Sequence, residues 1–274
     1  HIHDRRQRQM CIRDRSTGSP LSDDTFNFLN KKINKSSPIH SISGGTDIVS
    51  CFMLGNPMKP VFKGEIQSPG LGMDIDVFDD RGFPTRKTGE LVCKSPFPSK
   101  PIYFWNDRNN KKYQSAYFTK YINIWSHGDF VKKTDNGGYR VFGRSDATLN
   151  PGGVRIGTAE IYNILNSISF ISDSLAVGYK DKNDEKIILF LKSNHKINIT
   201  TRQITDIKKL IKKQLSPRHV PWKCFQVNDI PRTKSGKNSE IIVKKILNND
   251  RVVNLDALAN PESLNEYKSI KIYE

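Results

Sequence analysis

Two arginines flank a glycine loop near the middle of the chain. Arg144 and Arg155 enclose the adjacent glycines Gly152 and Gly153. A guanidinium presents its donors in a fixed fork that matches phosphate or ribose oxygens, and adjacent glycines let a ligand approach the backbone closely. The segment therefore predicts contact with a nucleotide, although a turn with two solvated arginines before a helix gives the same pattern.

Three further segments combine small residues with groups that can do chemistry. Residues 41–47 form a run of small side chains that ends in the hydroxyl of Thr46 and the carboxylate of Asp47. Asp129 follows Trp-Ser-His-Gly, and Lys237 follows Pro-Arg-Thr-Lys-Ser-Gly. Taken singly, a lysine in so basic a region is expected to be a solvated surface residue.

In this order, the four segments resemble the adenylate-forming superfamily, which includes acyl-CoA synthetases, adenylation domains of non-ribosomal peptide synthetases, and luciferases. The resemblance extends from about Ser16 to the end of the chain. The superfamily's upstream phosphate loop, rich in Ser, Thr and Gly and ending in Lys, is not found in this sequence, so we expect a carboxyl-terminal part of such an enzyme. The segments that narrow the resemblance to the acetoacetyl-CoA synthetase family are residues 17–21, 41–48, 63–67, 104–107, 143–146, 149–155 and 260–264.

The resemblance implies an ATP-dependent acid–thiol ligase that works in two half-reactions. The carboxylate of acetoacetate attacks the α-phosphorus of ATP to give an acyl-adenylate and diphosphate. The thiol of CoA then attacks the acyl carbonyl and releases AMP. ATP, Mg²⁺ and CoA are therefore the expected cofactors and substrates. A ligase for acetate or another short acid is one alternative, and a non-catalytic nucleotide-binding fragment is another.

The resemblance also implies a role for each motif residue. Lys237 would neutralise the charge that develops during adenylation, and Thr46 would bond a phosphate oxygen. Asp47, which replaces the usual Glu, would hold Mg²⁺; Asp129 would accept the ribose hydroxyls, and Asp146 would be the hinge. The other residues expected to line the nucleotide site are Gly18, Ser19, Pro20, Ser41, Ile42, Ser43, Gly44, Gly45, Arg144, Gly152, Gly153 and Arg155.

Gly44 bears on the size of the acid that the enzyme accepts. In acetyl-CoA synthetases the matching position looks like a Trp that closes the acid pocket. A glycine there would leave a cavity that a four-carbon acid could fill. We therefore expect Gly44→Trp to shift the preference toward acetate, provided that φ at this position is negative.

The pattern of secondary structure changes near the middle of the chain. Up to residue 143 it is strand-rich and punctuated by Gly and Pro, with a strand at 90–95 and a turn followed by a strand over 136–143. Residues 94–101, rich in proline, are expected to form a loop or an edge. The elements predicted after Arg144 are helices over 158–168, 201–215 and 239–247 and strands over 175–178, 187–191 and 223–227.

These elements predict a fold of the α/β and α+β classes with two parts. Residues 16–145 would be the carboxyl-terminal part of a large, strand-rich AMP-binding domain, and residues 146–274 a small mobile α+β domain. Residues 1–15 show no period and no caps and look like a non-native segment, with a native basic arm as the alternative.

Charge and composition limit the partners. The formal net charge is +16, which favours polyanions such as ATP and CoA; residues 1–15, with five Arg and two Asp, contribute +3 of it. The lysines are scattered and no nucleic-acid-binding motif is found, so no nucleic-acid partner is expected. No apolar run is long enough to span a membrane. The sequence does not predict the oligomeric state.

The cysteines favour a reducing compartment. No two of them have the spacing of metal ligands, and no disulfide framework is implied. A cytoplasmic location is therefore expected. The four cysteines are Cys11, Cys51, Cys93 and Cys224.

Overall fold

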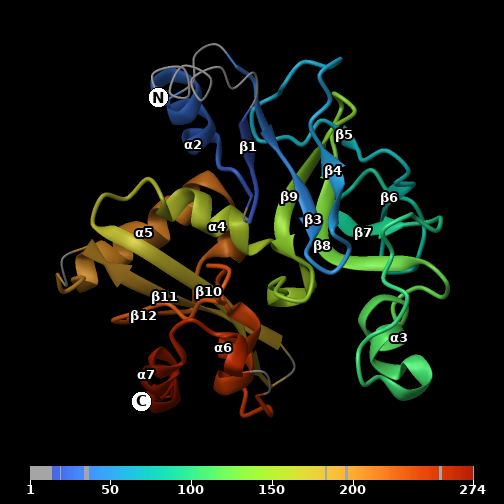
Figure 1. Ribbon diagram of the computed structural model, residues 1–274. Coiled ribbons are helices and arrows are strands. Elements are labelled where there is room, and N and C mark those ends of the chain that lie inside the picture. The colour runs from blue at the N-terminus through green and yellow to red at the C-terminus, as the bar shows by residue number, and fades with distance from the viewer. Residues whose placement is uncertain are drawn as a thin grey trace, which may run out of the picture. The chain divides into compact units, whose positions relative to one another are not determined.

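The structure is a computed structural model that describes residues 14–18, 20–33, 37–182, 184–194, 197–252 and 255–273. Its contacts divide the chain into two compact units, His1–Val141 and Phe142–Glu274 (Figure 1). The division falls shortly before the boundary that the sequence analysis placed after residue 145. The predicted site residue Ser19 and nearly all of the unusual segment 1–15 lie outside the described residues.

The first unit consists mainly of strands, with short helices between them. Its helices are α2 (Asp23–Phe28), the π-helical turn Leu29–Ile33, the 3₁₀ turn Arg108–Asn110 and α3 (Lys111–Tyr117). Its strands are β1 (Asp14–Ser16), β2 (Ile39–Ser41), β3 (Ser43–Gly45), β4 (Ser50–Leu54), β5 (Ser68–Pro69), β6 (Ile75–Phe78), β7 (Gly89–Cys93), β8 (Trp125–Lys133) and β9 (Tyr139–Arg144), the last of which runs into the second unit.

The core of the first unit lies against an antiparallel sheet. The strand order is β6-β7-β8-β9, and a separate sheet has the order β3-β4-β5. Every residue of β7 is buried, which confirms the strand predicted there. The rings of Phe52 and Phe97 and those of Phe97 and Trp125 pack edge to face, with centroids 5.2 Å apart in each pair. Such packing suits aromatic quadrupoles and fixes the sheets against each other.

The second unit alternates helices and strands. Its strands are β10 (Ile171–Asp181), β11 (Asp184–Ser193) and β12 (Lys223–Gln226). Its α-helices are α4 (Thr158–Leu165), α5 (Thr201–Gln214), α6 (Glu240–Leu247) and α7 (Leu264–Ser269). Its 3₁₀ turns are Pro151–Gly153, Pro217–His219, Leu255–Ala257 and Pro261–Ser263.

Helices cover both faces of the sheet in the second unit. Alternate residues of a strand point to opposite faces: Leu175 and Val177 pack in one apolar cluster with α6 and α7, whereas Ala176 packs in another with α4 and α5. The two helix pairs accordingly lie on opposite sides of β10-β11-β12 (Figure 1). This double coverage explains why residues 175–178 of β10 and 187–191 of β11 are continuous apolar runs, and the structure confirms the predicted mixture of helix and strand.

Sequence signals also fix where the helices begin. At the start of α5, the Thr200 hydroxyl accepts a hydrogen bond from the backbone amide of Gln203 at 3.3 Å, and Oε1 of Gln203 accepts one from the backbone amide of Thr200 at 2.8 Å. This reciprocal pair satisfies amides that a helix start leaves open.

Among the described residues, no helix has the length and apolar character needed to cross a membrane.

Candidate functional site

In the first unit, the hydroxyl of Thr46 and the carboxylate of Asp47, which end the small-residue loop 41–47, occupy a tight turn between β3 and β4. Thr46 and Asp47 are exposed in this turn, which is closed by a hydrogen bond from Val49 N to Thr46 O at 3.3 Å. Gly45 approaches the turn so closely that an added Cβ would overlap Oδ1 of Asp47 and lie 3.1 Å from Cε1 of His127. The loop therefore places two oxygen-bearing side chains on the surface of a compact backbone.

The carboxylate of Asp47 is oriented by a residue that the sequence did not single out. The hydroxyl of Tyr117, at the end of α3, donates to Oδ2 of Asp47 at 2.5 Å. The Tyr117 ring is itself stacked on Trp125, with centroids 3.6 Å apart. Because Tyr117 and Asp47 are 70 residues apart, no spacing in the sequence indicates this contact.

Asp129 lies beside the same loop. Ser43 donates its hydroxyl to Oδ2 of Asp129 at 2.9 Å, so the structure brings two of the predicted nucleotide-binding segments together. Asp129 follows Gly128, whose φ is +85° and whose amide donates to Oε1 of Glu90 at 2.8 Å. Glu90 is only 1% exposed and also accepts from Lys120 Nζ at 2.8 Å. Glu90 thereby fixes the irregular stretch of β8 that presents Asp129.

The segment after β1 also lies next to the loop. β1 pairs in parallel with β2, with Ser16 opposite Ser41, and the amide of Ile42 donates to Ser16 O at 2.9 Å. Gly18 follows β1 with φ of +97°, and a Cβ added to it would meet no atom within 4 Å. Gly18 thus lies on open surface near the start of the loop, and Pro20 follows it.

The structure corrects the expectation for Gly44. Its φ is outside the left-handed region, but an added Cβ would overlap the carbonyl oxygen of Ser50 and lie 2.5 Å from Cα of Cys51, both in β4. A glycine is therefore required here for the backbones of β3 and β4 to approach each other. A Trp at this position would displace β4 rather than fill a pocket.

In the second unit, Arg144 and Asp146 form an exposed ion pair. Arg144 Nε lies 3.4 Å from Oδ1 of Asp146, and both side chains are close to half exposed. The first residue of α6, Glu240, accepts a hydrogen bond from Tyr162 OH at 3.1 Å. Burial raises the pKa of Glu240 above its usual range, and the charge of Asp146 raises it further. The ion pair therefore joins Arg144, a predicted nucleotide contact, to the predicted hinge residue.

The glycine loop between the two predicted arginines is closed by a pair of backbone hydrogen bonds between Leu149 and Ile156. The amide of Gly152 donates to Asp184 Oδ1 at 2.7 Å, and its carbonyl accepts from Arg218 at 3.0 Å. Gly152 thus serves the internal structure of the loop. A Cβ added to Gly153 would meet no atom within 4 Å, so Gly153 is the position where a ligand could approach.

Lys237 ends a hairpin turn and is exposed. The amide of Thr233 donates to Lys237 O at 2.8 Å, and the amide of Gly236 donates to Thr233 O at 2.8 Å. Gly236 has φ of +81°, which glycine adopts without strain. Arg155, half-buried, lies in the same unit. The residues predicted to bind nucleotide are therefore distributed between the two units.

Known proteins resemble the chain over nearly its whole length. It is 50% identical over 257 residues to the acetoacetyl-coenzyme A synthetase of Rhizobium meliloti, strain 1021, and the match covers 93% of this chain and 40% of that protein. It is 45% identical over 258 residues to the acetoacetyl-CoA synthetase of Xenopus tropicalis, covering 93% and 38%. The solved acetoacetyl-CoA synthetase from Streptomyces lividans superposes with a TM-score of 0.83 at 37% identity, covering 93% and 40%. The chain is homologous to the acetoacetyl-CoA synthetases.

These matches confirm the resemblance inferred from the motifs and the expected fold, the carboxyl-terminal part of an adenylate-forming enzyme. No protein-family profile matches the chain. The chain spans about two fifths of the length of the acetoacetyl-CoA synthetases that it matches. The roles of individual site residues stay predictions, because likeness over the chain does not by itself assign them.

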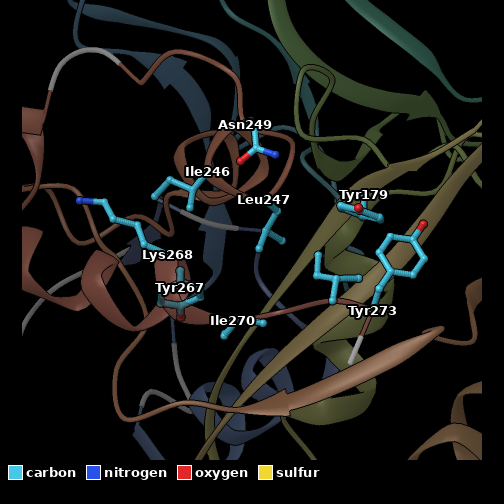
Figure 2. Close-up of a pocket in the computed structure, with 9 residues that line it drawn as sticks. Tyr179, Ile246, Leu247, Asn249, Tyr267, Lys268, Ile270 and Tyr273 are labelled. Atoms are coloured by element: carbon cyan, nitrogen blue, oxygen red, sulfur yellow. The ribbon is translucent and has the colours of Figure 1, made fainter.

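The second unit of this chain also has a cavity of about 300 Å³, shown in Figure 2. Tyr179 and Tyr273 lie next to each other on one side, with ring centroids 6.0 Å apart, and Lys268 and Asn249 are among the other lining residues. None of the residues predicted to bind nucleotide lines this cavity. It therefore plays no part in the site assembled above.

Proposed function

We propose that the chain is the part of an AMP-forming acid–thiol ligase that contributes the nucleotide-contacting loop and the mobile lysine, and that its acid is acetoacetate. The reaction converts acetoacetate, ATP and CoA into acetoacetyl-CoA, AMP and diphosphate. The observation that carries the proposal is the 50% identity to an acetoacetyl-CoA synthetase over 257 residues. The choice of acetoacetate over acetate rests on the names of the relatives, since the packing of Gly44 against β4 removes the argument from pocket size.

The geometry of the first unit supports a nucleotide site. Ser43 and Asp129 are joined by a hydrogen bond, and the loop that ends in Thr46 and Asp47 lies directly beside them. In the proposed site, Thr46 donates to a phosphate oxygen and Asp129 accepts from the ribose hydroxyls. These contacts hold ATP so that the acid can attack its α-phosphorus in line, because positioning supplies much of the catalysis of phosphoryl and adenylyl transfer.

Asp47 suits a magnesium ion. It is an exposed carboxylate whose direction is set by Tyr117, and Mg²⁺ is commonly bound by one or two carboxylates together with substrate phosphates. No group of three or more His, Cys, Asp or Glu side chains within the described residues could hold a metal by itself, which agrees with a site completed by substrate. The ion, when bound, neutralises phosphate charge.

The second unit supplies the remaining charges. Lys237 places an ammonium beside the phosphate oxygens as negative charge builds up on them during adenylation. Arg144 and Arg155 contact the ribose or phosphates through their guanidinium forks. A change of position of this unit about Asp146 would then allow the CoA thiol to reach the acyl carbonyl and AMP to leave.

The proposed location is the cytoplasm. In the described part of the chain, Cys51, Cys93 and Cys224 are free, as expected for a protein in a reducing compartment. Burial raises the pKa of the Cys224 thiol to about 11, so this thiol is neutral and unreactive at neutral pH.

An assay of the full-length reading frame that carries these residues tests the proposal. The purified protein is given ATP, Mg²⁺ and CoA with acetoacetate, acetate or a longer acid, and AMP formation is measured. We expect acetoacetate to give the highest kcat/KM. A clear preference for acetate would transfer the assignment to the short-chain ligases. Failure to form AMP with any of the acids would refute the proposed ligase activity.

A further inference from the structure

The side chain of Arg232, the residue directly before the turn that carries Lys237, holds the backbone of that turn. Within the turn, Thr233 closes the backbone, and its hydroxyl accepts from the amide of Lys237 at 3.1 Å. The carbonyl of Gly236, directly before Lys237, instead accepts from Nη1 of Arg232 at 2.7 Å. The peptide group that joins Gly236 to Lys237 is therefore fixed by the Arg232 side chain.

The same guanidinium is anchored to the sheet. Nη2 of Arg232 donates to Oδ2 of Asp173 at 2.5 Å, and Asp173 lies on β10 with its side chain only 18% exposed. A guanidinium is planar, and its donors have a fixed separation. Because one arm bonds Asp173 and the other bonds Gly236, the fork sets the distance between the sheet and the turn.

A later segment holds the backbone of Arg232. The side-chain oxygen of Asn260 accepts from the amide of Arg232 at 2.8 Å, and its NH₂ group donates to Asp229 Oδ2 at 2.6 Å and to Ile230 O at 3.0 Å. Asn260 opens residues 260–264, a stretch that the sequence analysis matched to the family without a role. Backbone hydrogen bonds from Lys234 N to Ala257 O and from Ala259 N to Arg232 O continue the support.

We propose that Arg232, anchored by Asp173, is a positioning residue that holds Lys237 where adenylation needs it. This inference rests on the proposed function. Lys237 is exposed, and an ammonium on a flexible stem stabilises a transition state only if the backbone that carries it is in place. Arg232 acts through the carbonyl of Gly236, and its guanidinium donates to protein oxygens of Gly236 and Asp173. Substitution of Arg232 should therefore affect the step that uses Lys237.

The test separates the two half-reactions in the full-length enzyme. Arg232→Lys keeps a charge beside Asp173 but cannot span both acceptors; Arg232→Ala removes both contacts. We expect both to slow acyl-adenylate formation by about 10-fold to 100-fold, the range that a small misplacement can cause. Formation of the thioester from pre-made acyl-adenylate should change less than about twofold. Asp173→Asn, which keeps an oxygen acceptor, should show a smaller loss in the same step.

A matched control comes from another ion pair of the second unit. Lys244 Nζ lies 2.8 Å from Oε2 of Glu185 on β11, with side chains 25% and 15% exposed. Lys244→Met should lower the melting temperature without favouring one half-reaction.

As a readout that does not depend on activity, Arg232→Ala in the 274-residue chain should speed hydrogen exchange at the amides of Gly236 and Lys237 by about tenfold or more.

The outcomes distinguish the two proposals. A wild-type enzyme that forms no AMP with any acid refutes the proposed function. An active wild type whose Arg232 variants are folded but lose both half-reactions equally, or lose neither, refutes the positioning role alone. If Arg232→Ala does not fold, the comparison of Arg232→Lys with Asp173→Asn decides the question in the same way.

Discussion

Lys237 can be tested by removing its ammonium. In the full-length enzyme, Lys237→Ala should raise the barrier to adenylation by about 3–4 kcal/mol, comparable to the loss of one charge-stabilising donor. The thioester step should survive, because the thiol attacks a carbonyl that is already activated. The two steps are measured by diphosphate release and by CoA consumption from pre-made acyl-adenylate.

The neighbouring Lys234 provides the control for this prediction. It is exposed in the same turn, and its backbone amide, which bonds Ala257 O, is kept in Lys234→Ala. This variant should therefore leave both steps close to wild type. An equal loss of both half-reactions in Lys237→Ala would contradict the division of labour between them.

At position 44, close packing of the backbone requires a glycine. Gly44→Ala adds a methyl group where the carbonyl of Ser50 already lies, so β4 must move. We expect a loss of about 1–3 kcal/mol of unfolding free energy, which is typical of overpacking, measured by urea denaturation of the full-length protein. Ser50→Ala, which keeps the backbone and adds no bulk, should cost less. Wild-type stability in Gly44→Ala would show that the hairpin can open at no cost.

The predictability of the elements follows from how each is stabilised. The apolar runs at 175–178 and 187–191 indicated buried strands because burial on both faces demands apolar residues at every position. α3 gave no such signal, since its residues Lys111–Tyr117 have no apolar period. Its start is held by Asp107, whose carboxylate accepts from the amides of Lys112 and Tyr113 at 2.9 and 2.8 Å. Tertiary packing of Tyr117 on Trp125 then fixes a helix that propensity does not predict.

The site was predictable only as a list of motifs. The order of the segments indicated that Ser43 and Asp129 serve one nucleotide, and the structure joins them. The contacts that aim the functional groups, Tyr117 to Asp47 and Arg232 to Gly236, depend on tertiary packing or turn geometry. Gly152 was expected to face a ligand, yet its amide is taken by Asp184. Sequence patterns indicate chemical groups better than they indicate which atoms are already bonded.

The connection between β9 and the glycine loop is the place to test a hinge. Asp146 lies in the turn directly after β9. Asp146→Pro fixes φ and removes an amide donor, so we expect it to slow one half-reaction far more than the other, as followed by separate assays of the two steps. Asp146→Ala, which loses the pair with Arg144 but keeps backbone freedom, should slow both only slightly. If Asp146→Pro leaves both rates near wild type, the hinge lies elsewhere, for example at the division between Val141 and Phe142.

Each unit of the molecule has its own apolar core, but the two differ in how much apolar surface they leave uncovered. In the second unit, two clusters lie on opposite faces of β10-β11-β12. In the first unit, Ile102 and Trp105 are 86% and 83% exposed within a single short stretch. Apolar side chains gathered on a surface favour association or aggregation. The chain spans about two fifths of the length of the acetoacetyl-CoA synthetases that it matches.

Two polypeptides test this view of the whole molecule. Residues 142–274 retain both apolar clusters of the second unit. They also retain Phe142, which packs so closely against Gly157 that a Cβ added to the glycine would lie 2.6 Å from Cβ of Phe142. This piece should be monodisperse and melt cooperatively, because its core is complete without the first unit. Residues 16–274 should bind ATP weakly and form no acyl-adenylate, since the nucleotide would meet only part of its site and be poorly positioned. Calorimetry and diphosphate release measure the two expectations. Rapid diphosphate release by residues 16–274 would show that these residues alone hold a complete adenylation site, and non-cooperative melting of residues 142–274 would show that the second unit needs the first in order to fold.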